Sequence, residues 1–284
     1  MLFKNYKNIF FQELSSLYDE KEIESFFYII LEKKHQLKRI DLALKPTLEL
    51  DENQLVQWDL ITEELKTQKP IQYILGETFF YGLRFVVNEN TLIPRPETEE
   101  LVALILSNNH VKTASNLKIL DIGTGSGCIA ISLVKNISTA TVFALDVSEK
   151  ALEIAKINAE KNDVAVTFLL KNILETDDLE QNFDIIVSNP PYVRNLEKRE
   201  INKNVLEYEP HLALFVEDDD ALLFYKKIAA LAQKNLFPDG KLFFEINQYL
   251  GKETVELLEK LDFKNIQLFK DIYGNDRMIS AIYS

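Results

Sequence analysis

The sequence predicts an α/β protein in which a small N-terminal helical bundle and a β-hairpin connector precede a doubly wound, mostly parallel sheet of seven strands. Three observations favour this fold. Residues 1–68 contain no glycine and a single proline, which suits helices. Residues 70–98 are rich in β-formers and turn residues. From residue 99, short apolar runs alternate with amphipathic stretches, the pattern of parallel strands covered by helices on both faces.

Residues 1–69 are expected to form the helical bundle. The acidic residues among positions 19–22 suit the positive end of a helix dipole, and apolar residues then recur at helical spacing as far as Leu31. A second helix is expected to begin near Asp51 and to carry Trp58. A small bundle of this kind is most often a recognition or packing module, and we assign it to substrate recognition.

Residues 70–98 are expected to form the connector. β-Formers dominate residues 78–81 and 83–87, and the turn residues at positions 87–91 favour a β-hairpin. The Ile93–Thr98 segment closes the connector, and its prolines and acid suit the start of a helix. We interpret the connector as stiff and as part of the active-site wall, with a plain interdomain linker as the alternative.

Residues 99–284 are expected to form the domain that is built on the sheet. Strands are predicted at residues 117–122, 141–145, 165–170, 183–187, 241–246, 263–269 and 278–283. Helices are predicted at residues 126–135, 148–160, 220–233 and 251–260. In open sheets of this kind ligands bind outside the carboxyl ends of the strands, so the polar motifs at those ends are the candidate site.

A glycine-rich loop at residues 123–127 follows the first strand of this domain and opens a helix. Glycines at alternate positions let the backbone turn tightly and approach a ligand closely. The loop is one residue short of the dinucleotide fingerprint and lacks the Gly-Lys-Ser/Thr of a P-loop. S-adenosylmethionine, which carries no phosphate, suits a loop of this form preceded by Asp121. We assign all five loop residues to cofactor binding: Gly123, Thr124, Gly125, Ser126 and Gly127.

Two further strand ends carry polar residues suited to the same cofactor. Asp146 ends the second strand about 20 residues beyond the loop, where an acid can accept both hydrogen bonds of a ribose diol. A helix cap is the alternative role for Asp146. Asn172 follows the third strand, where its side chain can reach the adenine amine, and a turn residue is the alternative. The neighbouring Ile173 is assigned to the same cofactor site.

The tetrapeptide Asn189-Pro190-Pro191-Tyr192 follows closely on a short apolar run, residues 185–187, that is typical of a buried parallel strand. Because the prolines cannot donate to a sheet ladder, the strand must end at Asn189 in a stiff turn. This turn offers a side-chain amide, a carbonyl and an aromatic ring to a ligand. A proline loop without a ligand is the alternative.

Composition and charge limit the classes of function. The chain has 284 residues and a net charge of −13, which disfavours a long nucleic-acid duplex as a partner, so we expect no direct nucleic-acid binding. Its single cysteine, Cys128, excludes an internal disulfide and a cysteine-based metal cluster, and we expect no metal. There is no signal-peptide pattern, and no apolar run approaches the ~20 residues that span a bilayer. We expect a cytoplasmic monomer that does not bind membranes.

Together these motifs resemble a class I S-adenosylmethionine-dependent methyltransferase, which has a Rossmann-like fold. The glycine loop, Asp146 and the Asn189–Tyr192 tetrapeptide carry the resemblance, and the tetrapeptide is typical of enzymes that methylate a planar amine or amide nitrogen. From about residue 70 onward the chain resembles the release-factor glutamine methyltransferase family (PrmC/HemK). The supporting segments are Tyr73–Gly76, Phe80–Leu83, Ile93–Glu99, Glu209–Leu214 and Asp271–Arg277.

The resemblance implies methyl transfer from S-adenosylmethionine to the side-chain amide nitrogen of the glutamine in the Gly-Gly-Gln loop of peptide chain release factors. It also implies that the helical domain helps to grip the release factor. Asn172 stands where the family commonly has Asp, and Asn247 stands where Gly is usual, so the adenine contact and the loop at residue 247 are expected to differ. The alternatives are a ribosomal-protein glutamine methyltransferase, a nucleic-acid adenine methyltransferase and a non-catalytic binding module.

An amide nitrogen is a poor nucleophile, so we expect the protein mainly to position and polarise it. Catalysis is assigned to Asn189, Pro190, Pro191 and Tyr192. The Asn189 oxygen and the Pro190 carbonyl are expected to accept the two N–H groups of the substrate amide, and the prolines to keep these acceptors rigid. Asn189 also borders the cofactor, and Phe80 and Tyr192 are expected to form an apolar wall over the amide. No general base is apparent, and the histidines are interpreted as structural: His35, His110 and His211.

Overall fold

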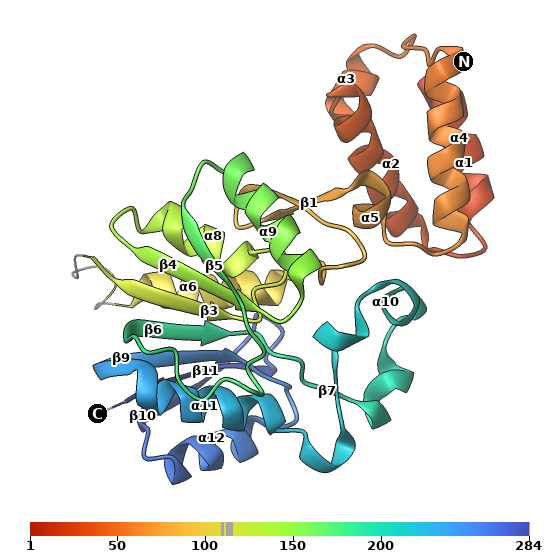
Figure 1. Cartoon of the computed structure of the whole chain (residues 1–284). Helices are drawn as coiled ribbons and strands as arrows, with labels where there is room; N and C mark the ends of the chain where they lie inside the picture. Colours follow the sequence, from red (N-terminus) through yellow and green to blue (C-terminus); the bar gives the residue numbers. More distant parts are fainter. Residues whose placement is uncertain (109–110, 112–115, 284) are drawn as a thin grey trace. The chain divides into compact units, whose positions relative to one another are not determined.

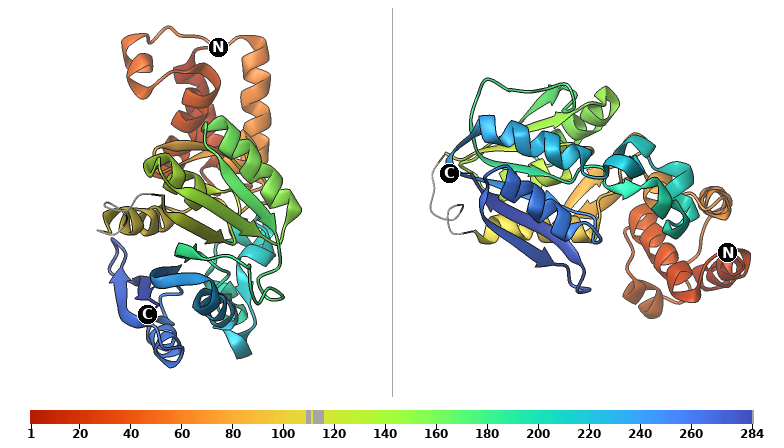
Figure 2. Two further views of the ribbon diagram at one scale, coloured as in Figure 1. Left: turned by 60° about the vertical axis from the view of Figure 1, so that its left-hand side comes forward. Right: turned by 90° about the horizontal axis from the view of Figure 1, so that it is seen from below.

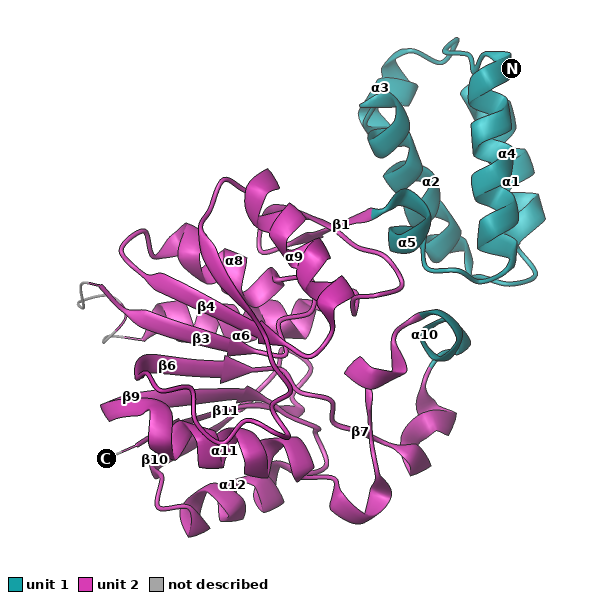
Figure 3. Cartoon of the chain, viewed as in Figure 1, with its two compact units in different colours: residues 1–76, 202–208 teal, residues 77–201, 209–284 magenta. Residues whose placement is uncertain are grey.

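The structure, a computed structural model, describes residues 1–108, 111 and 116–283 and divides into two compact units (Figure 3). The first unit contains Met1–Gly76 and Asn202–Tyr208, and the second contains the remaining residues. Residues 70–76, which we expected within the connector, belong to the first unit, where Ile71–Leu75 forms helix α5.

The first unit is helical, as expected. Its other helices are α1 (Phe3–Leu14), α2 (Glu20–His35), α3 (Arg39–Leu44), α4 (Glu52–Lys66) and α10 (Lys203–Tyr208). The indole of Trp58 is fully buried against aromatic side chains that include Phe27, and its Nε1 donates to His35 Nε2 at 2.8 Å. Asp19 and Asp51 accept from backbone amides at the starts of α2 and α4, so the acids that signalled these helices in the sequence also cap them.

The second unit begins with a β-hairpin, as predicted, but its turn does not lie at residues 87–91, which favoured a hairpin in the sequence and follow the second strand. Strands β1 (Glu77–Phe80) and β2 (Leu83–Val86) pair antiparallel, and Tyr81 and Gly82 form the turn between them. Both turn residues have a positive φ, +48° and +74°, as a two-residue hairpin loop requires.

Asn158 ties this hairpin to the glycine loop. It is fully buried on helix α9 (Glu149–Lys161). Its side chain accepts from Val86 N at 2.6 Å and donates to Val86 O at 3.0 Å. It also donates to Ser126 O at 2.9 Å, so every hydrogen-bonding group of the amide has a backbone partner.

The predicted seven-stranded sheet forms the centre of the second unit (Figure 1). Its strands are β3 (Lys118–Ile122), β4 (Thr141–Asp146), β5 (Val166–Leu170), β6 (Phe183–Ser188), β9 (Leu236–Glu245), β10 (Lys264–Lys270) and β11 (Asp276–Ile282). They lie in the order β10-β11-β9-β6-β3-β4-β5. Strands β9, β6, β3, β4 and β5 are parallel, and β11 is antiparallel to both of its neighbours. The mostly parallel α/β fold is therefore confirmed.

Helices cover both faces of the sheet (Figure 1, Figure 2). Helices α6 (Pro96–Ser107) and α8 (Cys128–Asn136) pack on one face, and α11 (Leu223–Asn235) and α12 (Gly251–Lys260) pack on the other. Successive strand residues serve opposite faces, as Ile119 lies in one hydrophobic core and Leu120 in the other. Because both faces are buried, the strand ends are where polar groups can gather.

Between β6 and α11 lies a run of short elements that the sequence analysis did not assign. They are β7 (Val193–Arg194), η1 (Asn195–Glu200), η2 (His211–Ala213), β8 (Phe215–Val216) and η3 (Asp218–Asp220). Strands β7 and β8 pair in parallel. Among the helices of the described chain, none has the length and apolar character needed to cross a membrane.

Candidate active site

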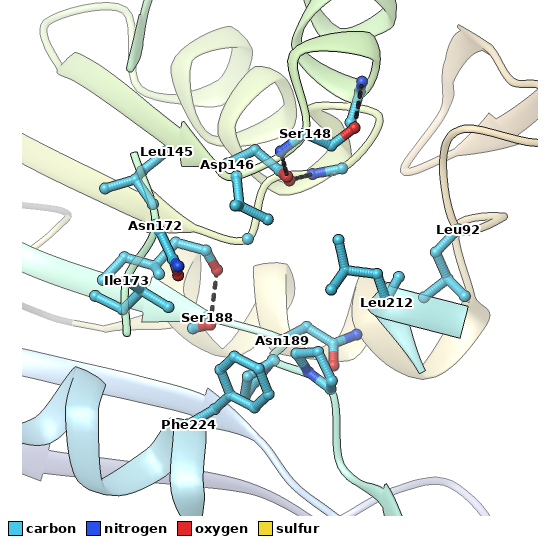
Figure 4. A pocket seen from close by; sticks show the side chains of 18 of the residues that line it. Leu92, Leu145, Asp146, Ser148, Asn172, Ile173, Ser188, Asn189, Leu212 and Phe224 are labelled. Carbon is cyan, nitrogen blue, oxygen red and sulfur yellow. Dashed lines mark hydrogen bonds between the residues drawn. The ribbon is translucent and has the colours of Figure 1, made fainter. Parts of the chain in front are cut away.

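A pocket lies at the carboxyl ends of the parallel strands (Figure 4). The last residues of β3, β4 and β6 all line it, namely Ile122, Asp146 and Ser188. The predicted site residues that line it are Gly123, Gly125, Asp146, Asn172, Ile173, Asn189, Pro190 and Pro191. The glycine loop, the polar strand ends and the proline turn thus meet at the edge where doubly wound sheets bind ligands.

The glycine loop borders the pocket through its first two glycines. Gly123 and Gly125 have φ values of +75° and +55°, and a Cβ atom at either position would meet nothing within 4 Å. Their missing side chains therefore leave space for a ligand against the backbone. Gly127 differs, because a Cβ there would lie 2.9 Å from Ile131 Cδ1 and 3.2 Å from Ala155 Cβ. It permits close packing between α8 and α9.

Asp146 holds the loop and faces the pocket. Its Oδ2 accepts from Gly125 N at 2.8 Å, and its Oδ1 accepts from Ser148 N at 2.9 Å. Burial raises the pKa of Asp146, and these backbone donors oppose the shift. A carboxylate has about four acceptor positions, so each oxygen keeps one for a ligand hydroxyl. The cap of α9, the alternative role for Asp146, belongs to Ser148, whose hydroxyl accepts from Ala151 N.

Asp121 and Thr124 lie behind the glycine loop. The fully buried Asp121 uses Oδ2 to accept from Thr124 Oγ1 at 2.7 Å and from Ala130 N at 3.3 Å. Its Oδ1 has no hydrogen-bond partner among the described residues. Burial raises the pKa of Asp121 to about 7. A buried carboxyl group with an unpartnered oxygen beside the loop favours a ligand that brings positive charge.

Asn172 and Ile173 form a further wall, just after β5. Asn172 Oδ1 accepts from Leu174 N at 3.0 Å, so this side chain has the turn-capping role given as its alternative. Ile173 is 8% exposed and adds apolar surface together with Phe224 of α11. Phe224 was not predicted, because an apolar residue on a helix carries no local signal that separates a pocket wall from the core.

Hydrogen bonds fix the tetrapeptide from behind. Asn189 Nδ2 donates to Thr98 Oγ1 at 3.2 Å. The Tyr192 hydroxyl donates to Glu245 Oε1 at 3.1 Å, and burial raises its pKa. The Tyr192 carbonyl accepts from Asn247 Nδ2 at 3.0 Å, so Asn247 contacts the turn through a side chain that glycine would lack.

The connector and residues 209–213 contribute one side of the pocket. Leu92 of the connector and Leu212 both line it and lie on the same side of the view in Figure 4. Glu209 joins the two segments, because its Oε1 pairs with the Arg95 guanidinium at 2.5 Å and its Oε2 accepts from Ile93 N at 3.2 Å. The side chain of Glu209 is 1% exposed, so this ion pair is partly buried and well placed to fix the wall.

Five predicted site residues do not line the pocket within the described structure: Phe80, Thr124, Ser126, Gly127 and Tyr192. Phe80 is 1% exposed and packs edge-to-face against Phe85 in the hydrophobic core, so it does not reach a substrate amide. Thr124 and Ser126 are buried, and their side chains are enclosed by protein.

His35 and His211 do not line the pocket. His35 bonds Trp58 in the first unit, and the ring of His211 contacts Phe215 with centroids 5.2 Å apart. His110 lies outside the described residues. Across the described parts of the chain, no group of three or more His, Cys, Asp or Glu side chains is placed to hold a metal ion.

The pocket fits S-adenosylmethionine. Open backbone at Gly123 and Gly125 and a carboxylate at Asp146 suit a nucleoside that carries positive charge, and the buried carboxyl group of Asp121 lies behind the loop without lining the pocket. Ile173 and Phe224 supply apolar surface for a base.

Known proteins similar to this chain support the same conclusion. A model of the methyltransferase small domain matches residues 101–211, and a model of the PrmC N-terminal domain matches residues 10–76. The release factor glutamine methyltransferase of Flavobacterium psychrophilum is 70% identical over 99% of both chains. That of Bacteroides thetaiotaomicron is 42% identical over 95% of this chain and 96% of its own.

A methyltransferase structure from Pyrococcus furiosus has the same fold. It matches with a TM-score of 0.52 at 20% identity and covers 82% of this chain and 98% of its own. The resemblance read from the motifs is confirmed by the near full-length relatives. This chain belongs to the release factor glutamine methyltransferase family, whose members are S-adenosylmethionine-dependent enzymes.

Proposed function

We propose that this enzyme methylates the side-chain amide nitrogen of the glutamine in the Gly-Gly-Gln loop of peptide chain release factors. The observation that carries the proposal is that Asn189, Pro190 and Pro191 share one pocket with the glycine loop and Asp146. A planar amide held at the proline turn would therefore lie beside the methyl donor. The helical residues 1–69 are proposed to grip the same release factor.

The cofactor would be held by the chain's own strand ends. The backbone at Gly123 and Gly125 would line it closely, and Asp146 would accept from the ribose diol through the acceptor positions that Gly125 N and Ser148 N leave free. Ile173 would pack against the adenine, with Asn172 beside it. When bound, S-adenosylmethionine supplies an activated methyl group.

Asn189 would orient the substrate. Because its Nδ2 is committed to Thr98, its Oδ1 is the atom that remains to accept a hydrogen bond from the substrate amide. The Pro190 carbonyl would accept the second N–H. Holding both hydrogens would aim the nitrogen at the methyl carbon, and the prolines would keep both acceptors from moving during the reaction.

Asn189→Ala tests this assignment. Removal of one preorganised polar group in a catalytic site typically costs ~10²–10³ in rate, so we expect turnover to fall by about that factor while the fold is kept. Asn136→Ala is a suitable control, because the Asn136 side chain donates to Ser132 O of its own helix at 2.8 Å and does not line the pocket. Near-native methylation by Asn189→Ala would rule out the role given to this amide.

The substrate itself is tested by labelled S-adenosylmethionine. The wild-type enzyme is incubated separately with release factor, ribosomal proteins and nucleic acid, and the label is mapped. We expect it on the release-factor glutamine, whereas label on a ribosomal protein or on adenine would support the alternatives instead. We also propose a cytoplasmic location, which a release-factor substrate would support. The monomeric state and the lack of nucleic-acid binding stay predictions, which sedimentation and a filter-binding assay would check.

A further inference from the structure

A chain of buried hydrogen bonds runs behind Asn189. Asn189 Nδ2 donates to Thr98 Oγ1 at 3.2 Å, and Thr98 Oγ1 donates to Glu245 Oε2 at 2.7 Å. The other carboxylate oxygen, Glu245 Oε1, accepts from the Tyr192 hydroxyl at 3.1 Å. Thr98 is 3% exposed and Glu245 is 1% exposed, so solvent does not offer these groups other partners. The links come from the first turn of α6, the last residue of β9 and the proline turn.

The chemistry of these groups decides which of them donates and which accepts in each hydrogen bond. An ionised carboxylate can only accept, and a threonine hydroxyl has one proton to donate. Since that proton goes to Glu245, Thr98 can offer Asn189 only a lone pair. Asn189 must then turn its NH2 group toward Thr98, which leaves its oxygen for the substrate. A reversed amide would set two acceptors against each other at a buried contact.

We propose that Thr98 and Glu245 are positioning residues that fix the orientation of the Asn189 amide, so that its oxygen rather than its NH2 group meets the substrate. The inference rests on the proposed function, because the orientation matters only if the substrate brings N–H groups to Asn189. It also gives Thr98, the last residue of the Ile93–Thr98 segment, a task in the reaction beyond connecting two parts of the chain.

Each carboxylate oxygen of Glu245 faces one hydroxyl group, Thr98 at Oε2 and Tyr192 at Oε1, which suits an ionised side chain. Burial raises its pKa, and the Thr98 hydroxyl, the Arg277 guanidinium and the Tyr192 hydroxyl act in the opposite direction. A protonated or amidated side chain at this position would be able to donate a hydrogen bond, and the donor and acceptor at each link would no longer be fixed.

The Glu245→Gln replacement therefore reverses the direction of these hydrogen bonds, with almost no change in the shape of the side chain. In that variant the glutamine oxygen can keep the bond from Tyr192, which places its NH2 group against Thr98. Thr98 then accepts a hydrogen bond from the NH2 group of residue 245 and donates one to the Asn189 oxygen. Asn189 would turn its NH2 group to the pocket, where it would face the N–H groups of the substrate.

The experiment uses five full-length proteins beside the wild type: Glu245→Gln, Thr98→Val, Thr98→Ser, the double variant Glu245→Gln/Thr98→Val, and Thr254→Val. Thr254 is a matched control because it is fully buried, donates to Leu250 O at 2.7 Å and lies on α12 away from the pocket lining. For each protein we would measure kcat and KM with release factor, the Kd of S-adenosylmethionine by calorimetry, and the melting temperature.

We expect Glu245→Gln to lower kcat by about 10²-fold, as loss of a preorganised polar group does, with an unchanged cofactor Kd. Thr98→Ser should stay near the wild type, because it keeps the hydroxyl. Thr98→Val should lower kcat only a few-fold, since it leaves neither amide orientation favoured. The decisive result is the double variant: removing Thr98 in the Glu245→Gln background should raise kcat toward the Thr98→Val value.

A purely structural role predicts the opposite for the double variant, namely further loss, and that result would overturn the proposal. It would also be overturned if Glu245→Gln kept kcat within about twofold of the wild type. If Glu245→Gln fails to fold, the Thr98→Val and Thr98→Ser pair still decides: equal kcat values for the two, with melting temperatures matching Thr254→Val, would contradict the proposal.

A measurement made without substrate distinguishes failure of this inference from failure of the proposed function. Solvent exchange of the Asn189 side-chain NH2 group, followed by ¹⁵N NMR, should be slow in the wild type and faster in Glu245→Gln, where the group faces the pocket. Unchanged exchange would refute the positioning role. Absence of methyl transfer by the wild type, with the exchange difference present, would refute the proposed function alone.

Discussion

Replacing Asp146 by alanine tests the cofactor site most directly. The carboxylate already accepts from Gly125 N at 2.8 Å and from Ser148 N at 2.9 Å, one bond to each oxygen. With about four acceptor positions on a carboxylate, two remain, and a ribose diol needs two. The replacement removes both proposed ribose bonds and also releases the backbone of the glycine loop.

The size of the effect follows from the charge on the acceptor. A hydrogen bond to a charged group contributes ~1.5–3 kcal/mol, which corresponds to ~10–150-fold in Kd at 1.36 kcal/mol per factor of ten. We expect the Kd of the product, S-adenosylhomocysteine, to rise by at least ~10-fold in Asp146→Ala. The 2′-deoxy and 3′-deoxy analogues should each bind the wild type ~10-fold or more weakly, since each lacks one hydroxyl.

Calorimetry on both proteins with all three ligands separates ribose recognition from loosening of the loop. In Asp146→Ala the parent ligand and its deoxy analogues should bind about equally. Asp184→Ala is the matched control, because Asp184 accepts from Lys118 N at 2.7 Å in the same sheet but does not line the pocket. Discrimination between the ligands that persists in Asp146→Ala would refute the ribose assignment, as would a wild type that does not discriminate.

Two further predictions concern stability. Gly127→Ala should lower the free energy of unfolding by ~2–4 kcal/mol in denaturant titration, because φ is +81° and the new Cβ would lie 2.9 Å from Ile131 Cδ1. Gly82→Ala, with φ of +74° and nothing within 4 Å, should cost only the ~1–2 kcal/mol of backbone strain. For Asp121, the pKa of about 7 exceeds the ~3.9 of an unfolded chain, so its contribution to stability is present at low pH and is lost as pH rises through 7. The ligand-free protein should lose ~2 kcal/mol from this group between about pH 5.5 and 7.5, and Asp121→Asn should remove that part of the pH dependence.

Each stability prediction has a contrary outcome. Equal losses of unfolding free energy for Gly127→Ala and Gly82→Ala would mean that the close contact of the new Cβ with Ile131 adds nothing to the backbone strain. An identical pH dependence for Asp121→Asn and the wild type would mean that other buried carboxyl groups, such as Glu245, account for the whole effect.

The sheet and the strand-end motifs were predictable because their signals are local. Apolar β-branched runs mark β3 and β6, and the glycine loop and Asp146 stand directly after strands in the sequence. One boundary was missed for a clear reason. Strand β9 begins at Leu236, which pairs with Phe183, whereas the sequence predicted a start at residue 241. Residues 237–240 bulge out between Leu236 and Lys241, and Asp239 has a φ of +65°, so an isolated pair before a bulge left no local strand signal.

The groups behind the proline turn could not be predicted in the same way. Thr98 and Glu245 are 147 positions apart, and their contact exists only once the sheet has formed. Taken alone in the sequence, Thr98 indicates only the start of a helix, and Glu245 indicates only the end of a strand. Phe80 shows the converse problem: its neighbours in the sequence suggested a site, whereas β1 turns the ring into the core. Which face of an edge element is buried depends on tertiary packing, which one sequence does not display.

Asn158 has a consequence for how the chain behaves outside catalysis. A two-stranded ribbon is marginally stable by itself, and its free edges invite pairing with other chains. By both donating to and accepting from Val86, the Asn158 amide occupies the hydrogen-bonding groups that an incoming strand would use on β2. A side chain on a helix thus takes the place of a neighbouring strand at Val86, and we expect this to protect the ribbon against self-association. Loss of this amide would therefore appear first as aggregation on storage or during refolding.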